Sequence, residues 1–578
     1  MWKYINKYLV FLILAGLSML IEVGVDLIQP ELMTTIVDDG VLGVNTGGIG
    51  NMSIILSKGL TMVALVFFGC MGGAMCGVFA NIACENVGNK MRKDCFGRIM
   101  RFSFPQVDSF GTGALITRIT NDITQVQNMV MQMVRGAVRT SCMFLGSIFF
   151  MFRLYPQFGV IVLCALPFII GCTVFCLRKA NPHFSAMQAQ LDRINAIMQE
   201  DISGIRIIKA CVREVYEKVR FGKANDTLIG TQLHVLIIFA FMTPVMNAIM
   251  YIVVVSILLV GSVQVSGGGA TPGAIMGAIT YTTQLLNSIL GLVMLFQNIS
   301  RGTASWKRVR EILHTEPELK DGGFDGVTEE KGRIEFRNVS FAYPGTGKTI
   351  LENINLSIAP GETIAIMGAT GCGKTSLVNL IPRFYDVTEG QVFVDGVDVR
   401  DYDQHALRGK VAIALQNSEL FSISIAENIA WGDLASSQEA IISAAETAQA
   451  NGFITNTENG YDTVVSERGM SLSGGQRQRI SIARAVLKKA DILIFDDSSS
   501  ALDLKTESQL YDALERDHAD TTKIIVAQRI ASVRRADRIV VLENGHIAAC
   551  GSHEELLDSC AIYQDIYHSQ IGSEVDDE

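Results

Sequence analysis

The feature that most constrains this chain is a run of 74 residues, 227–300, that contains no Asp, Glu, Lys or Arg. A helix needs about 20 apolar residues to cross a hydrocarbon core of ~30 Å. The run is interrupted at 266–272 by a glycine-rich turn, so it can supply two such helices. The sequence therefore predicts an all-α domain of six spans over residues 1–312, with the other four spans at 8–36, 60–84, 133–152 and 154–177.

Basic residues in the loops predict which ends of these spans face the cytoplasm. Segments 85–126 and 178–226 hold six and nine Lys or Arg residues, whereas the short loops near Asp38, Arg153 and Gly267 hold few. The two long segments are therefore expected in the cytoplasm, as helical extensions that project well beyond the bilayer. This pattern predicts a multi-pass protein of the plasma membrane.

The composition changes after the last span. Residues 1–312 carry 25 basic and 16 acidic side chains, a net charge of +9, and the remaining residues carry 23 and 42, a net charge of −19. This acidic balance argues against nucleic acid as a partner, because nucleic-acid binding needs a basic face. We expect a linker at 313–332, a soluble α/β domain with buried parallel strands at 333–572, and an acidic tail at 573–578.

A phosphate-binding loop follows one of the predicted strands. The segment Gly368-Ala-Thr-Gly-Cys-Gly-Lys-Thr375 matches G-x-x-x-x-G-K-[ST] and comes directly after the apolar run 363–367. In such a loop the backbone amides face the phosphates, the lysine neutralises their charge and the last hydroxyl reaches Mg²⁺. Asp496 ends another apolar run, 492–495, and its carboxylate can hold the Mg²⁺ shell. The candidate ATP-binding residues here are Gly368, Ala369, Thr370, Gly371, Cys372, Gly373, Lys374, Thr375 and Ser376.

A third motif, Leu472-Ser-Gly-Gly-Gln476, lies between the loop and Asp496. Its small residues can open a helix whose N-terminus binds an anion. The three motifs in this order resemble the nucleotide-binding domain of an ABC (ATP-binding cassette) transporter, which implies a P-loop NTPase fold for 333–572. The six-span half resembles the exporter type, in which membrane and ATPase domains are fused. The resemblance covers nearly the whole chain.

The resemblance implies roles for further residues. Tyr343 matches the aromatic that stacks on adenine, although a surface tyrosine at a strand edge would fit the same pattern. Gln416 matches the glutamine that meets Mg²⁺ and senses the membrane domain, and Asp503 lies in the loop that crosses to the partner. The stretch 466–469 resembles the one that touches the cytoplasmic loops. In the family the signature motif caps the ATP held by a second subunit, which assigns that role to Leu472, Ser473, Gly474, Gly475 and Gln476.

Two residues depart from the family pattern. The family usually has Glu after the Asp at the end of this strand, as the general base, and this chain has Asp497. The shorter side chain withdraws the carboxylate by ~1.5 Å, and a misplacement of ~1 Å can lower a rate on the order of 100-fold. Gln528 replaces the usual switch-loop His and cannot carry its positive charge. These changes, with Gln416 as the third catalytic residue, predict a weak ATP site, unless the enzyme is efficient with unusual residues.

The cytoplasmic segments resemble the family's coupling loops. Segment 104–113 resembles the first, and we expect a short helix around Asp108 to Gly113 to enter a groove of an ATPase domain near Gln416 or near its equivalent in a partner, so that Phe110→Asp should uncouple transport. Segment 201–217 matches the second. The alternative for both is a solvated amphipathic helix.

Two carboxylates lie inside the first predicted span. Glu22 and Asp26 are one helical turn apart and so share a face. Charged groups at membrane depth usually face a cavity or a partner. The pair is a candidate contact for a cationic substrate, with a polar contact to another helix, or a position near the outer interface, as alternatives.

The sequence thus predicts one half of a heterodimeric ABC exporter that uses ATP and Mg²⁺ to export a small amphipathic substrate, a drug, lipid or peptide, across the lipid bilayer. Its own site would hydrolyse ATP poorly, and its signature motif would complete the competent site of a second half-transporter. The alternative is a nucleotide-gated regulator or channel subunit that binds ATP without driving transport. The sequence identifies neither the substrate nor the partner chain.

Overall fold

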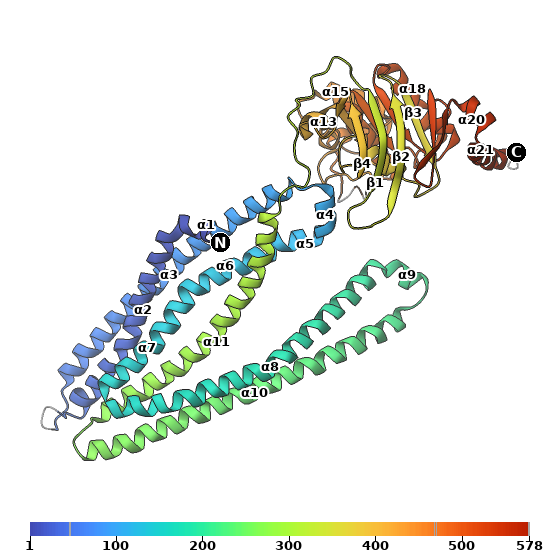
Figure 1. The fold of residues 1–578 in the computed structure, drawn as a ribbon. Coiled ribbons are helices and arrows are strands. Elements are labelled where there is room, and N and C mark those ends of the chain that lie inside the picture. The colour runs from blue at the N-terminus through green and yellow to red at the C-terminus, as the bar shows by residue number, and fades with distance from the viewer. Residues whose placement is uncertain (45–47, 467–468, 470, 576–578) are drawn as a thin grey trace. The chain divides into compact units, whose positions relative to one another are not determined.

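The computed structural model describes residues 1–578 except 45–47, 467–468, 470 and 576–578 (Figure 1). The chain divides into two compact units. The first comprises Met1–Arg98 and Gly113–His314, and the second comprises Ile99–Thr112 and Thr315–Glu578. The division near residue 314 lies close to the expected boundary at 312, but the short segment Ile99–Thr112 belongs with the second unit.

The first unit is built from long helices. Within its described residues, six helical segments are long and apolar enough to cross a membrane, which confirms the expected six-span fold. They contain 40 to 53 residues each, about 60–80 Å at ~1.5 Å per residue, whereas the hydrocarbon core is ~30 Å thick. The elements are α1 (Trp2–Ile5), η1 (Asn6–Tyr8), α2 (Leu9–Thr35), η2 (Ile36–Val41), α3 (Met52–Ile99), α5 (Thr112–Thr117), η3 (Arg118–Asp122), α6 (Ile123–Met131), η4 (Gln132–Gly136), α7 (Ala137–Leu154), α8 (Pro156–Ser203), α9 (Ile205–Ala210), α10 (Glu214–Ser266) and α11 (Pro272–His314).

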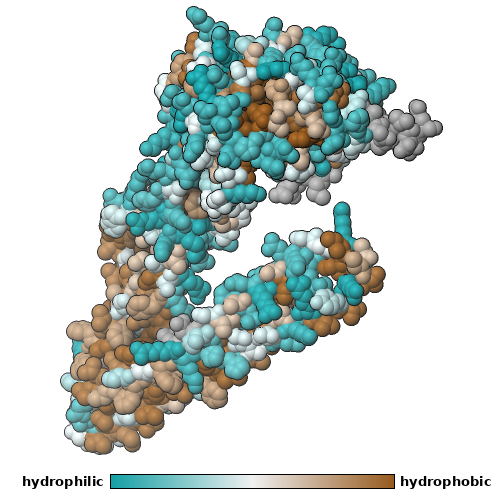
Figure 2. Space-filling model, turned by 45° about the vertical axis from the view of Figure 1, so that its right-hand side comes forward, coloured by the Kyte–Doolittle hydropathy of each residue, from teal (hydrophilic) through white to brown (hydrophobic). Residues whose placement is uncertain are grey.

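The outer surface of these helices is apolar along part of their length. Leu60, Phe67 and Phe168 are 72%, 68% and 72% exposed, which would be unfavourable in water. Figure 2 shows such side chains gathered over the lower part of the helical unit, while hydrophilic side chains are more frequent toward the upper ends of its helices. The apolar part suits lipid, and the long helix ends suit the cytoplasm.

The second unit contains two β-sheets. A six-stranded sheet has the order β10-β9-β3-β8-β7-β6, and the five strands from β9 to β6 run parallel. A four-stranded antiparallel sheet has the order β2-β1-β4-β5. The strands are β1 (Ile334–Ala342), β2 (Thr349–Ile358), β3 (Thr363–Gly368), β4 (Glu389–Val394), β5 (Val397–Asp398), β6 (Val411–Ala414), β7 (Ile492–Asp496), β8 (Thr522–Val526), β9 (Arg538–Glu543) and β10 (His546–Gly551).

The parallel strands carry the predicted motifs. Every residue of β7 and β8 is buried, and apart from Asp496, Thr522 and Lys523 these residues are apolar, as is typical of strands covered on both faces. The expectation of buried parallel strands in an α/β domain is thus confirmed. The carboxyl ends of β3, β7 and β8 meet at one edge of the sheet, where ligands bind in open α/β folds.

The second unit also contains helices, of which α13, α15 and α18 are drawn beside the sheets in Figure 1. The helices are α4 (Phe104–Phe110), α12 (Lys374–Asn379), α13 (Gln404–Lys410), α14 (Ile425–Ala430), α15 (Gln438–Thr447), α16 (Asn451–Thr455), η5 (Gly460–Asp462), α17 (Gly474–Leu487), α18 (Leu504–Asp517), α19 (Ile530–Val533), α20 (His553–Ser559) and α21 (Ala561–Val575). The expected acidic tail begins inside α21, and its last residues, 576–578, lie outside the described residues.

Candidate nucleotide-binding site

The phosphate-binding loop connects β3 to α12. Gly371 and Gly373 adopt φ values of +85° and +104°, a conformation that L side chains rarely take. A Cβ atom on Gly373 would also lie 2.7 Å from Leu351 Cδ2, so only glycine fits there. The Lys374 ammonium donates to the carbonyl oxygens of Gly368 and Ala369 at 2.7 and 2.9 Å, which places its charge inside the loop.

The end of β7 supplies two carboxylates. Asp496 is 1% exposed and accepts a hydrogen bond from Thr375 Oγ1 at 2.9 Å, and burial raises the pKa of this carboxyl above its ordinary value. Asp497 has a φ of +48°, and its amide donates to the carbonyl of Val526 at 2.9 Å. Its Oδ2 accepts from Gln416 Nε2 at 3.2 Å. The backbone turn therefore directs the second carboxylate toward the glutamine.

These groups surround one cavity of about 300 Å³. Tyr343 closes one side, and its hydroxyl lies 2.9 Å from Ser376 Oγ. The cavity contains the three predicted catalytic residues and most of the predicted ATP-binding residues, and its lining also includes two apolar residues that the sequence reasoning missed. Its walls are formed by Tyr343, Ile350, Thr370, Gly371, Gly373, Lys374, Thr375, Ser376, Gln416, Asp496, Asp497, Val526 and Gln528.

Three of the predicted loop residues do not line the cavity. Gly368 and Ala369 contribute their carbonyl oxygens to Lys374, and the Cys372 side chain is 7% exposed within the apolar core. Ile350 lies near the start of β2 and Val526 at the end of β8, and neither belongs to a motif. No signal in the sequence distinguishes these two from other buried apolar residues.

The donor set fits a magnesium ion. Mg²⁺ prefers oxygen ligands and usually binds through one or two protein groups and the phosphates of its substrate. Thr375 Oγ1, Asp496 and the side-chain amide of Gln416 are such groups, and all three line the cavity. They are the residues that would hold Mg²⁺ beside the phosphates.

The signature motif starts a helix at another place. Ser473 is the N-cap of α17, and its hydroxyl accepts from the Gln476 amide at 3.3 Å while Gln476 Oε1 accepts from the Ser473 amide at 2.9 Å. A Cβ on Gly475 would lie 2.9 Å from the carbonyl oxygen of Ala501, which explains the need for glycine. Among the residues that line the described cavity, none belongs to 472–476. The helix opening is as expected from the sequence, and its action on a partner's ATP stays a prediction.

Asp503 has a local role. It caps α18, where its carboxylate accepts from the amide and the hydroxyl of Thr506 at 2.9 and 2.8 Å. These hydrogen bonds hold the pKa of Asp503 below its usual range. The cap fixes the start of α18 and with it the loop that precedes Asp503.

The chain matches two family models in order. Residues 12–289 match the ABC transporter transmembrane region, and residues 351–500 match the ABC transporter family itself. The chain belongs to the ABC transporter family. It carries the fused membrane and ATPase domains of an exporter in the plasma membrane, with an ATPase domain in the cytoplasm that binds and hydrolyses ATP.

Relatives match over most of this ABC transporter. The "Uncharacterized ABC transporter ATP-binding protein YfiB" of Bacillus subtilis (strain 168) is 37% identical over 99% of this chain and 98% of its own length. An "ATP-dependent lipid A-core flippase" of Desulfotalea psychrophila is 38% identical over 85% of this chain and 86% of its own. The solved structure titled "Structure of a bacterial Atm1-family ABC exporter with ATP bound" has the same fold, with a TM-score of 0.79, 24% identity and 98% coverage of both chains.

The segment expected to form the first coupling loop packs within the second compact unit. Helix α4 begins with a capping box at Ser103 and places Phe104 4.5 Å from Phe384, measured between ring centroids. Tyr385 donates its hydroxyl to Asp108 Oδ2 at 3.3 Å. The ring of Tyr385 also meets that of Tyr343 edge-on at 5.2 Å. The helix therefore contacts Tyr385, and Tyr385 in turn meets Tyr343 at the wall of the cavity.

Two aromatic residues of this segment make different ring contacts. Phe110 stacks on Phe102 of its own segment with centroids 5.6 Å apart, and Phe104, at the start of the helix, packs on Phe384 and Tyr385. Entry of the helix into a groove near Gln416, or near its equivalent in a partner, stays a prediction. The sequence could not indicate which aromatic of 102–110 faces the domain, because the helix is shorter than two periods of 3.6 residues.

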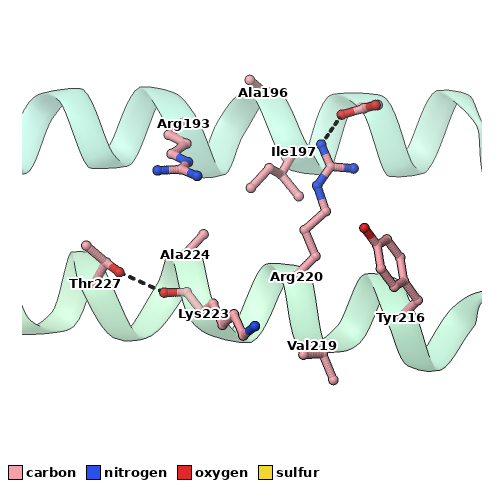
Figure 3. Close-up of a pocket in the computed structure, with 10 residues that line it drawn as sticks. Arg193, Ala196, Ile197, Tyr216, Val219, Arg220, Lys223, Ala224 and Thr227 are labelled. Atoms are coloured by element: carbon pink, nitrogen blue, oxygen red, sulfur yellow. Dashed lines mark hydrogen bonds and ion pairs between the residues drawn. The ribbon is translucent and has the colours of Figure 1, made fainter.

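The second coupling segment lies at the end of a helical hairpin. Helices α8 and α10 enclose a cavity of about 470 Å³, and Figure 3 shows Arg220 reaching from α10 to Glu200 on α8, a pair 2.6 Å apart. Buried Ile197 and Ala224 pack beside it. Of the segment 201–217 from the sequence analysis, Tyr216 lines this cavity. The contacts brace the hairpin that presents α9.

The hairpin end is apolar and exposed. Ile207 is 70% exposed and Val212 is 80% exposed, although both lie in a segment expected in the cytoplasm. Part of another expected contact, the stretch 466–469, lies outside the described residues at 467–468.

The two carboxylates of the first span have a common partner. The Arg139 guanidinium on α7 pairs with Glu22 and also with Asp26, the latter at 3.2 Å. A polar contact between helices, one of the alternatives considered from the sequence, is therefore present. The three side chains together carry one net negative charge, and contact with a substrate stays a prediction.

Proposed function

We propose that this chain is one half of a heterodimeric ABC exporter and that its own ATP site hydrolyses slowly. The observation that carries the proposal is the composition of one cavity. Lys374, Thr375 and Asp496, which bind phosphate and Mg²⁺, are all present, while Asp497 and Gln528 depart from the family at the catalytic side of the same cavity. Binding is preserved and the chemistry is weakened.

The chain's own residues account for this behaviour. Lys374 and the loop amides bind the phosphates, and Mg²⁺, when bound, neutralises part of their charge. Gln416 donates to Asp497 and so orients its carboxylate. That carboxylate is one methylene short of the usual base, which costs rate through distance. Gln528 can donate a hydrogen bond to a phosphate oxygen but cannot supply the charge of an imidazolium.

The second half-transporter supplies what this chain lacks. The N-terminus of α17 is capped and opened by small residues, as an anion-binding helix end requires. It would meet the ATP held by the partner's phosphate-binding loop and complete a competent site there. The exposed apolar end of the hairpin at α9 supports docking on the partner's ATPase domain, because Ile207 and Val212 would be covered there.

The substrate class that we propose is a small amphipathic molecule. Three relatives are named ATP-dependent lipid A-core flippases, 36%, 38% and 30% identical to this chain, which supports a lipid-like molecule as substrate. The cluster of Glu22, Asp26 and Arg139 adds one net negative charge inside the span and favours a cationic group on the substrate.

Neutral amides test the charge of this cluster. Glu22→Gln together with Asp26→Asn should lower transport of cationic substrates about threefold to tenfold more than transport of neutral ones, since Arg139 would then be unopposed. Vesicle uptake of matched cationic and neutral dyes measures it, with Arg139→Gln as the control that leaves the carboxylates in place. An equal loss for both dyes would assign the cluster a purely structural role.

Transport assays separate the proposal from the alternative function. Purified with its partner, the protein should show vanadate-sensitive ATPase activity that is stimulated by substrate and linked to substrate flux in inside-out vesicles. ATP binding with ion conductance or partner regulation, and without flux, would instead indicate a nucleotide-gated regulator or channel subunit.

A further inference from the structure

The C-terminal helix reaches the catalytic loop through one side chain. Gln570 on α21 donates from Nε2 to the carbonyl oxygen of Gln528 at 2.8 Å and accepts at Oε1 from the amide of Ile530 at 2.8 Å. The two bonds bracket Arg529 and attach both sides of the switch loop to a helix 40 residues further along the chain. The side chain of Gln528 lies in the nucleotide cavity, while its backbone is attached here.

The switch loop has little local support for this conformation. Helix α19 begins after Arg529, whose side chain gives no capping hydrogen bond, and it is only four residues long. Ile530 is 3% exposed, so its amide has no access to water and needs a partner within the protein. Gln570 is that partner.

The switch loop is connected to residues 500–503, the loop that contains Asp503 and is called the D-loop in the family. The Arg529 guanidinium donates to the carbonyl oxygens of Ser500 and Leu502, each at 3.1 Å. Between these two residues, the amide of Ala501 donates at 2.9 Å to Gln478 on the signature helix α17. A continuous set of hydrogen bonds therefore runs from α21 through the switch loop to the D-loop and α17.

We propose that Gln570 is a positioning residue for ATP hydrolysis: it fixes the switch loop that carries Gln528 and, through Arg529, the D-loop. The Gln570 side chain holds the backbone at Gln528 and Ile530 through two hydrogen bonds. It thereby sets the position of the Gln528 side-chain amide, which has to meet the terminal phosphate of ATP. The inference concerns hydrolysis itself and applies whether the partner is a copy of this chain or a different one.

Helix α21 makes other contacts besides those of Gln570, so a control variant on the same helix is available. Tyr563 is fully buried and its hydroxyl lies 2.7 Å from His553 Nδ1. Gln564, on the same helix, donates to the carbonyl of Leu557 and does not touch the switch loop in the described contacts. Gln564→Leu is therefore a matched control, since it removes one amide hydrogen bond of α21 and leaves Gln570 in place.

The first experiment compares kcat and KM for ATP in the full transporter, assembled in lipid nanodiscs. Gln570→Leu should lower kcat about threefold to tenfold with KM for ATP unchanged, and Gln564→Leu should leave kcat unchanged. Equal kcat values for the two variants would overturn the proposal.

A second variant separates positioning from simple capping. Gln570→Glu keeps an acceptor for the Ile530 amide but loses the donor to the Gln528 carbonyl. We expect it to recover the melting temperature that Gln570→Leu loses while kcat stays low. Full recovery of kcat by Gln570→Glu would show that Gln570 only caps α19 and would overturn the positioning role.

A double-mutant cycle tests the connection to the D-loop. If Gln570 acts partly through Arg529, Gln570→Leu should lower kcat by a smaller factor in an Arg529→Leu background than in the wild-type background, where the bond to the Gln528 carbonyl and the path through Arg529 are both lost. Losses that multiply in full would contradict the path through Arg529.

Discussion

Two regions of the ATPase domain, the cavity and the signature helix, differ in how closely their residues follow the family pattern. In the cavity, the phosphate-binding groups are in place, but Asp497 and Gln528 stand where a longer carboxylate and an imidazole are usual. At the signature helix, Ser473 and Gly475 keep both the capping box and the close approach to Ala501. On our proposal, this domain binds ATP in its own cavity but hydrolyses it slowly, while its signature helix completes the ATP site of the partner.

The largest expected effect separates these two regions. Gly475→Asp should lower the vanadate-sensitive ATPase activity of the assembled transporter by more than about 100-fold, since it puts a carboxylate where a phosphate has to bind and presses on the Ala501 carbonyl. Asp497→Glu should retain activity. Phosphate release from the co-purified complex measures both.

Ser473→Leu is a second signature variant, which tests whether the loss of activity in Gly475→Asp comes from misfolding. It removes the N-cap without adding a Cβ near Ala501, at a cost of about 1 kcal/mol of folding stability, and should also abolish turnover. Retained turnover in both signature variants would contradict the claim that the signature helix serves a competent ATP site.

A smaller effect is expected at α4, which contacts Tyr385, the neighbour of the cavity residue Tyr343. Phe104→Asp should reduce transport per ATP hydrolysed about tenfold, because it removes the packing on Phe384 and places a carboxylate one turn from Asp108. ATP binding should persist. Flux and ATPase activity measured in the same vesicles give the ratio.

Phe110→Asp is the comparison variant for this helix. The sequence predicts that it uncouples transport, whereas the packing of Phe110 on Phe102 gives Phe104→Asp the larger effect. Coupling that is unchanged in both variants at normal expression would remove α4 from the coupling path.

The smallest effect is a pH dependence of the cavity. Burial raises the pKa of Asp496, so protons compete with Mg²⁺ at a less acidic pH than at an ordinary aspartate. The affinity for ATP with Mg²⁺ should therefore fall about threefold as the pH decreases from about 7.5 to about 5.5, and it should level off above the raised pKa.

Binding of a fluorescent ATP analogue at several pH values measures this dependence. Asp496→Asn cannot titrate and should lose both the Mg²⁺ requirement and the slope. An identical slope in Asp496→Asn would assign the pH dependence to another group.

The sequence predicted the fold classes and the motif geometry but not the contacts between distant segments. The length of a run without charged residues is enough to predict a membrane span. An apolar strand followed by glycines predicts the phosphate-binding loop, so the sequence could place Lys374, Thr375 and Asp496 in one site. The docking of Phe104 on Tyr385 and the bonds of Gln570 to the switch loop join residues 281 and 40 positions apart. No local period or spacing specifies such pairs, because they depend on tertiary packing.

The pairing of Arg139 with Glu22 and Asp26 could not be predicted from the sequence either. Two carboxylates on one helical face indicate that a compensating group is needed. Which helix supplies it depends on how α2 and α7 pack, and several basic residues near the spans were available.

The central claim, a weak ATP site in a chain that needs a different partner, is tested most directly by the ATPase activity of this chain purified alone. The account predicts that it binds ATP through Lys374 yet hydrolyses it slowly, and that co-expression with the partner chain restores turnover. ATP should then remain bound at the Asp497 site through several turnovers of the partner's site. Robust ATPase activity from this chain alone, abolished by Asp497→Asn, would contradict the claim.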